Sequence, residues 1–108
     1  MPEYIIVYVT CSSKSEAENI GRYLLQKRLT ACINIIPEMT SSYFWPPKED
    51  KLDKSEESIL LIKAKFENYE QIESEVLKIH SYDNPAFFAI PLVAISKKYA
   101  DWIDSETK

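Results

Sequence analysis

The chain has 108 residues, which favours a single domain over residues 1–108. Hydrophobic residues make up 45% and charged residues 28%, a composition typical of globular proteins and not of disordered ones. The net charge of −4 lacks the basic excess that phosphate binding uses, so we expect no nucleic-acid partner. An apolar run of about 18 residues is missing, which predicts no membrane span. Met1-Pro2-Glu3 leaves no room for a signal peptide before the first strand, so we expect a cytoplasmic protein.

The first half of the chain reads as a strand, a helix and a long strand. Residues 4–11 are almost all β-branched or aromatic, which predicts a strand, and their unbroken apolar run favours burial on both faces. Ser13 and Glu16 have the spacing of a helix capping box, and the helix should run to about Arg28. Residues 30–45 are rich in strand formers, and a proline within them predicts a bent strand.

The second half is predicted to continue with a polar turn, a third strand, a second long helix, a loop, a fourth strand and a short last helix. In chain order these elements cover residues 46–51, 54–66, 68–80, 81–85, 87–95 and the segment that Ser96 caps. Pro91 marks a bulge or an edge in the fourth strand.

The order β-α-β-β-α-β-α matches the ferredoxin-like split β-α-β fold, an α+β class with both long helices on one face of an antiparallel sheet. A sheet with one face in water should alternate apolar and polar residues, but residues 5–7, 59–62 and 87–90 are continuously apolar. The one remaining short helix is too small to cover the second face. We therefore expect self-association to cover it.

Few side chains are suited to chemistry. His80 is the single histidine, and it is either a metal ligand, a general acid-base or a helix-end residue that interacts with the last carbonyls. Cys11 is either a nucleophile or a buried or half-buried free thiol, Cys32 reads as a free thiol of the core, and we expect both to lie apart from His80. The single glycine, Gly21, excludes a glycine-rich phosphate loop. Because acid-base catalysis needs positioned partners and the sequence indicates none, we expect no enzyme.

Two further features point to contacts with other molecules. Tyr43-Phe44-Trp45 is an aromatic cluster at the end of a strand, which favours an interface or a core position. Lys63 projects from the third strand on the same side as Lys65. It is either solvated or holds a small anion.

A series of short segments carries a more specific pattern. The segments are Arg28-Leu29-Thr30-Ala31-Cys32-Ile33-Asn34, Ser41-Ser42-Tyr43-Phe44-Trp45, Leu61-Ile62-Lys63, His80-Ser81-Tyr82-Asp83-Asn84-Pro85-Ala86 and Tyr99-Ala100-Asp101-Trp102-Ile103. In this order they resemble the RLxACxN, SxYxW, ILKT, HPYxxPA/E and YxxWL stretches of CutA, the divalent-cation tolerance proteins. The resemblance spans almost the whole chain.

This resemblance implies a homotrimeric, cytoplasmic, non-catalytic protein of divalent-metal tolerance that binds copper weakly. It implies that His80 ligates the metal. It also implies that the clefts between subunits hold Thr10, Tyr43, Trp45, Lys63, Tyr82 and Pro85. The alternative is a PII-like trimeric sensor that holds an anionic metabolite in such clefts through Lys63.

The chain departs from the family pattern at three places. Ser81 stands where the family has a proline after the histidine, and Pro46-Pro47 replaces a turn with glycine. Val9 stands where some members have a cysteine, and Cys11 comes one residue after Thr10. We therefore expect Cys11 to contribute little to a copper site.

Overall fold

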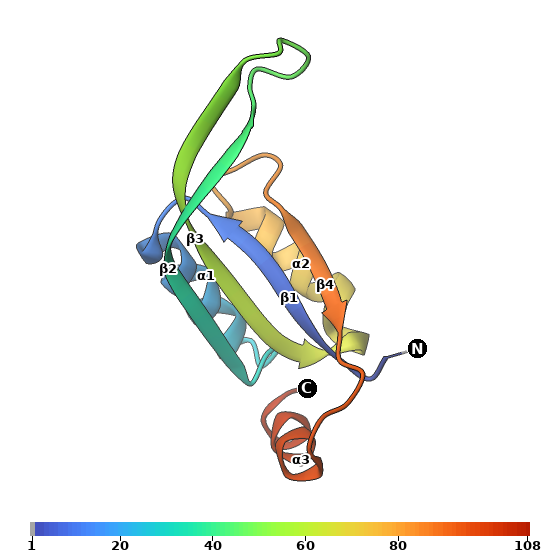
Figure 1. Cartoon of the computed structure of the whole chain (residues 1–108). Coiled ribbons are helices and arrows are strands. Elements are labelled where there is room, and N and C mark those ends of the chain that lie inside the picture. The colour runs from blue at the N-terminus through green and yellow to red at the C-terminus, as the bar shows by residue number, and fades with distance from the viewer. Residues whose placement is uncertain (1) are drawn as a thin grey trace.

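The computed structural model of the chain describes residues 2–108, and Met1 lies outside them. Its elements are β1 (Tyr4–Cys11), α1 (Lys14–Gln26), β2 (Cys32–Phe44), β3 (Leu52–Lys65), the 3₁₀ turn η1 (Phe66–Asn68), α2 (Tyr69–Ile79), β4 (Phe87–Pro91) and α3 (Lys97–Glu106) (Figure 1). The order of strands and long helices is the predicted one, and η1 is an addition at the start of α2.

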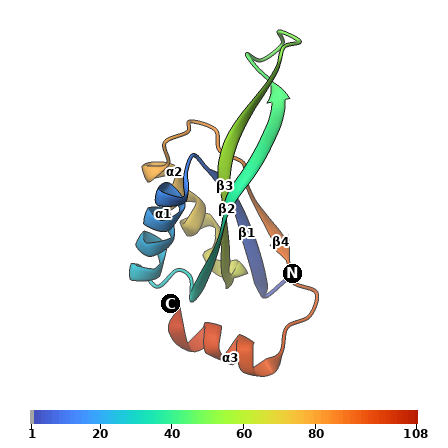
Figure 2. The same cartoon turned by 60° about the vertical axis from the view of Figure 1, so that its left-hand side comes forward.

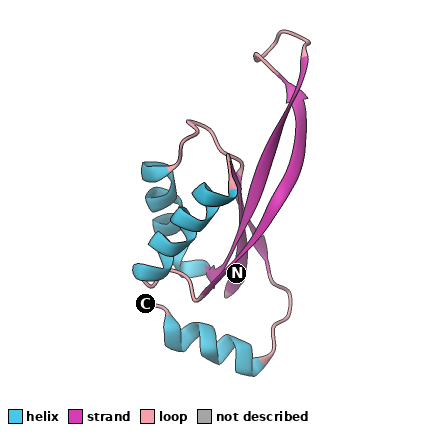
Figure 3. Ribbon diagram, turned by 90° about the vertical axis from the view of Figure 1, so that its left-hand side faces the viewer, coloured by secondary structure: helices cyan, strands magenta, loops and turns pink. Residues whose placement is uncertain are grey.

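The strands form one antiparallel sheet in the order β2-β3-β1-β4. Both long helices, α1 and α2, lie on the same side of this sheet (Figure 3). The predicted α+β, ferredoxin-like split β-α-β fold is therefore confirmed. The strand that comes first in the chain, β1, is an inner strand between β3 and β4.

The face toward the helices forms the core. Alternating residues of β1 and β3 point into it, and Val7, Leu60 and Ile62 are fully buried. Gly21 of α1 packs directly on β2, because a Cβ at this position would overlap the Cδ1 of Ile33. The single glycine thus allows close packing of helix on sheet.

The opposite face is also apolar, but it is only partly covered. Phe88 and Ile90 of β4 are 46% and 45% exposed, and Phe88 stacks on Tyr8 with 4.7 Å between ring centroids. Within residues 2–108, α3 reaches this face only at the end away from the β2–β3 turn (Figure 2). There the Tyr4 hydroxyl donates to Asp104, 2.9 Å from each carboxylate oxygen.

The β2–β3 hairpin extends beyond the sheet as a two-stranded ribbon (Figures 1 and 2). The register shifts between Ile36 and Met39, next to Pro37, which confirms the predicted bend. At the tip Phe44, Trp45 and Leu52 are 59%, 56% and 77% exposed. The ribbon therefore presents apolar side chains that the rest of the chain does not cover.

Two predicted element ends were wrong. The fourth strand stops at Pro91 and not at residue 95, because its partner β1 begins at Tyr4: the Leu92 N–H makes a last bond of 3.0 Å to the Tyr4 carbonyl, and Val93 beyond it is fully exposed. Helix α1 stops at Gln26. The N–H of Leu29 then donates back to the Leu24 carbonyl at 3.1 Å, and these two buried leucines close the helix end.

Candidate functional site

Three side chains that can ligate a metal meet where β1 ends, α1 begins and α2 ends. The ligand atoms of Cys11, Glu16 and His80 lie within 4.8 Å of one another. Cys11 and the His80 ring are fully buried, and the Glu16 side chain is 14% exposed. The prediction that Cys11 lies apart from His80 was wrong, because the ends of β1 and α2 meet at the same edge of the sheet.

Both ring nitrogens of His80 are in hydrogen bonds. Nδ1 accepts the N–H of Tyr82 at 3.0 Å, and Nε2 lies 2.7 Å from the carbonyl oxygen of Thr10. Because Nδ1 accepts, the proton of the neutral ring is on Nε2, which donates to Thr10. The ring is thus fixed in one tautomer by two backbone groups.

Glu16 ties the start of α1 to the segment after α2. One of its oxygens accepts from the N–H and hydroxyl of Ser12 at 2.8 and 2.9 Å, and the other accepts from the N–H of Ser81 at 2.8 Å. Burial acts to raise the pKa of Glu16, but these hydrogen bonds outweigh it and lower the pKa to about 2. The predicted cap is confirmed for Ser13, which accepts from the Glu16 N–H at 3.1 Å. The carboxylate itself binds Ser12 in place of Ser13.

Cys11 is a neutral thiol at ordinary pH. Burial is the main cause that raises its pKa to about 12, and the carboxylates of Glu16 and Glu57 add to it. The group offers one sulfur, one nitrogen and one oxygen. Such a mixed donor set suits a borderline-soft divalent ion more than a hard one.

The structure brings several of the predicted cleft residues to this same edge. Thr10 exchanges hydrogen bonds with Ala86, its N–H donating at 3.2 Å and its hydroxyl accepting at 3.1 Å. The Tyr82 hydroxyl donates to Glu57 of β3 at 2.8 Å, and Pro85 is buried. Thr10, His80, Tyr82 and Pro85 therefore form one neighbourhood.

The other predicted residues lie elsewhere in the chain. Tyr43 is on the ribbon, where its hydroxyl is hydrogen-bonded to that of Ser55, and Trp45 is at the exposed tip. Lys63 is opposite Ile6 in the sheet, with its Nζ 5.6 Å from the ring centroid of Tyr99 in α3. Within a single chain, Tyr43, Trp45 and Lys63 therefore lie apart from the His80 neighbourhood.

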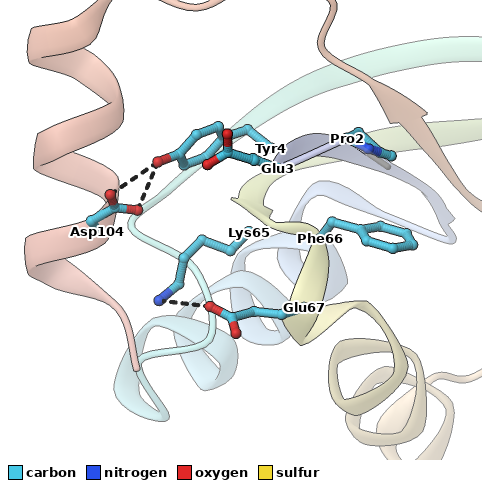
Figure 4. A pocket seen from close by; sticks show the side chains of 7 residues that line it. All are labelled: Pro2, Glu3, Tyr4, Lys65, Phe66, Glu67 and Asp104. Carbon is cyan, nitrogen blue, oxygen red and sulfur yellow. Dashed lines mark hydrogen bonds and ion pairs between the residues drawn. The ribbon is translucent and has the colours of Figure 1, made fainter.

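A hollow of about 430 Å³ lies at the other end of the sheet, between the start of β1, the end of β3 and α3 (Figure 4). Four of its side chains form two pairs: Tyr4 binds Asp104, and Lys65 lies 3.4 Å from Glu67. It is open, and its one lysine is already paired with a carboxylate. The Cys11–Glu16–His80 group is therefore the better candidate.

The sequence did not single out Glu16 or Cys11 for this site. The Ser13–Glu16 spacing indicated only a helix cap, and Cys11 has no ligand partner nearby in the chain. Their link to His80 depends on the path of the whole chain, since the bonded pair Thr10 and His80 are 70 positions apart.

Comparison with known proteins agrees with the fold. The family described as "CutA1 divalent ion tolerance protein" matches residues 5–106. The chain belongs to the CutA1 family. The family predicted from the short segments is thus confirmed.

Two CutA relatives illustrate the range of similarity. The protein of Archaeoglobus fulgidus named "Divalent-cation tolerance protein CutA" is 39% identical over 98 residues, which are 91% of this chain and 92% of the relative. The chloroplastic CutA protein of Arabidopsis thaliana is 33% identical over 104 residues, which are 96% of this chain and 56% of the plant protein. The archaeal name states tolerance to divalent cations, and neither name states a reaction.

Solved CutA structures share the whole fold. CutA1 of Ehrlichia chaffeensis superposes with a TM-score of 0.92 at 28% identity, covering 100% of this chain and 98% of its own. The Archaeoglobus fulgidus structure, described as a periplasmic divalent cation tolerance protein, gives 0.91 at 34% identity over 97% and 99% of the two chains. In residues 2–108 of our chain, no helix has the length and apolar character to cross a bilayer.

Proposed function

We propose that this CutA1-family chain is a single-domain, non-catalytic, cytoplasmic protein of divalent-cation tolerance that works as a homotrimer and binds copper weakly. The observation that carries the proposal is the group of sulfur, nitrogen and oxygen donors at Cys11, Glu16 and His80. Copper accepts all three donor types. Binding is weak because the nitrogen and oxygen donors are already hydrogen-bonded.

The absence of catalysis is part of the same proposal. A general base needs a free lone pair that reaches a substrate. The His80 ring is fully buried, and both of its nitrogens are engaged with backbone groups. This arrangement supports a binding role for His80.

Calorimetric titration with copper(II) tests the metal proposal. His80→Ala and Cys11→Ala should each reduce binding, because both residues contribute donors to one group. Cys32→Ala is the matched control: it removes the other thiol, which lies in β2 opposite Lys63, and should leave binding unchanged. Unchanged binding in both His80→Ala and Cys11→Ala would contradict the proposal.

The trimer is supported by two surfaces that a single chain leaves open. One is the apolar sheet face around Tyr8, Phe88 and Ile90, and the other is the aromatic tip of the ribbon. Exposed apolar patches of this kind mark interfaces. Neighbouring copies would also bring the predicted cleft together, because Tyr43, Trp45 and Lys63 lie apart from the His80 neighbourhood within one chain. Light scattering on a sizing column should give about three times the 12.6 kDa chain mass, and a single-chain mass would contradict the trimer.

One observation favours the second candidate, a PII-like sensor of an anionic metabolite. Lys63 forms no ion pair within residues 2–108. Burial acts to lower the pKa of its ammonium group, but interactions with Tyr99 and Cys32 outweigh burial and raise the pKa. An unpaired ammonium on a face that another copy covers could hold an anion. Inorganic phosphate serves as the probe: binding that Lys63→Gln abolishes would favour the sensor.

A further inference from the structure

Two of the three donor atoms of the Cys11–Glu16–His80 group accept hydrogen bonds from one loop. The Ser81 N–H occupies the Glu16 oxygen that faces His80, and the Tyr82 N–H occupies His80 Nδ1. These donors are consecutive residues at the start of the α2–β4 loop. An ion and this stretch of backbone therefore compete for the same atoms.

The distances suit an ion at this place. His80 Nδ1 and the near Glu16 oxygen are 3.9 Å apart. Metal bonds of about 2.0–2.2 Å to nitrogen and oxygen reach across that gap. The ligand atoms all lie within 4.8 Å of one another, whereas tetrahedral zinc with bonds of about 2.0–2.3 Å holds such atoms roughly 3.3–3.6 Å apart, so the side chains must approach by up to about 1 Å. Small side-chain movements would close the site.

The other side of the His80 ring is arranged as in known metal sites. A ligating histidine commonly donates its second N–H to a backbone carbonyl or a carboxylate, which fixes the tautomer. His80 Nε2 already donates to the Thr10 carbonyl at 2.7 Å. That bond can persist while Nδ1 exchanges the Tyr82 N–H for an ion.

We propose that a borderline-soft divalent ion binds Cys11 Sγ, whose thiol proton passes to solvent, together with Glu16 Oε2 and His80 Nδ1, and that it displaces the Ser81 and Tyr82 amides and so releases the start of the α2–β4 loop. This inference rests on the proposed function, for which it supplies the ion site and the response. The Tyr82 hydroxyl binds Glu57 at the base of the β2–β3 ribbon. Release of the loop thus changes the Tyr82–Glu57 contact at the base of the ribbon. Ion binding at the buried Cys11–Glu16–His80 group therefore alters the ribbon surface, which that group does not contact.

Amide hydrogen exchange on the full chain, with Zn²⁺ as the probe, tests the release. The Ser81 and Tyr82 amides should exchange at least about tenfold faster with Zn²⁺ than without it, because each loses a hydrogen bond. Amides in the middle of β1 and β3 should not change. Zn²⁺ binding that leaves the Ser81 and Tyr82 amides as slow as before, or slower, would overturn the proposal.

Two cysteine variants identify the ligand set. Co²⁺ bound through a thiolate gives a charge-transfer absorption, which Cys11→Ser should abolish and the matched control Cys32→Ser should keep. The two outcomes for copper separate this inference from the proposed function. Copper binding that Cys11→Ala and His80→Ala reduce, while the Ser81 and Tyr82 amides exchange as slowly with Zn²⁺ as without it, overturns the loop release alone, whereas absence of copper binding in the native chain contradicts both.

Position 81 offers a sharper test of the competition. Ser81→Pro removes the N–H that occupies Glu16, so Zn²⁺ affinity should rise by about tenfold. Ser81→Ala keeps that N–H and should leave the affinity unchanged. Equal affinities in the two variants, or weaker binding in Ser81→Pro, would mean that the loop does not compete with the ion.

Discussion

The two faces of the sheet are built from alternating residues of the same strands, but the chain covers one face fully and the other only in part. On the helix side Leu60 and Ile62 are fully buried by α1 and α2. On the other side the neighbouring Ile59 and Leu61 are half-buried, and Phe88 and Ile90 remain almost half exposed. The chain completes the first face by itself, whereas the second is apolar without a cover. The difference shows that apolar residues in a strand indicate a face that becomes covered, whether by the same chain or by another molecule.

The exposed face should carry the largest effect on assembly. In Phe88→Asp a charge replaces the ring that stacks on Tyr8, so we expect the mass in solution to fall from about three chains to one. Leu77→Asp is the matched control, because Leu77 is also 46% exposed but lies on the outer side of α2. A sizing column with light scattering decides it. An equal loss of mass in both variants would contradict the distinction between the faces.

The covered face should carry the largest effect on the fold of the single chain. Leu60→Ala leaves a cavity among fully buried side chains and should lower the free energy of unfolding by about 2–5 kcal/mol. Leu61→Ala removes the same atoms from the other face, and in the Phe88→Asp background it should cost less than half as much. Urea unfolding of both variants gives the comparison. Equal losses of unfolding free energy would show that a single chain buries both faces of the sheet to the same extent.

The close packing of α1 on the sheet can be tested at Gly21. Alanine favours helix by about 1 kcal/mol over glycine, but its Cβ would overlap the Cδ1 of Ile33. Overpacking costs about 1–3 kcal/mol, so Gly21→Ala should lower stability or at best leave it unchanged. Adding Ile33→Val removes that Cδ1 and should recover part of the loss. A double variant less stable than the sum of the single changes would rule out the contact with Ile33 as the cause.

The smallest expected effect on stability is that of Glu16, which lies at one edge of the sheet. The folded pKa of Glu16 is about 2, below its ordinary value of 4.5. A lowered carboxyl pKa contributes stability that is present above pH 4.5 and is lost as the pH falls toward 2. The urea midpoints of the native chain and Glu16→Gln should therefore differ near neutral pH and converge near pH 2. A gap that stays constant with pH would assign the effect of Glu16 to shape and not to charge.

The fold was largely predictable because its signals are local. The β-branched run of β1, the Ser13 and Ser96 caps and the helical spacing of α2 each lie within a few residues, and each is found in the structure. The end of β4 was missed because the partner strand β1 begins at Tyr4 while the apolar run continues to residue 95. The candidate site was only half predictable. His80 stood out as the single histidine, but its neighbours Cys11 and Glu16 are placed by the convergence of β1, α1 and α2, which no local pattern records.

The inner position of β1 has a consequence for synthesis of the chain. Cys11 pairs with Ser58 and Val9 with Phe87, so β1 waits for partners that are made much later. The local β2–β3 hairpin and α1 can form early, whereas pairing across such separations is slow. An apolar strand therefore stays unpaired through most of translation. The sheet closes only after β4 has been made, and newly made copies meet with their second face already formed.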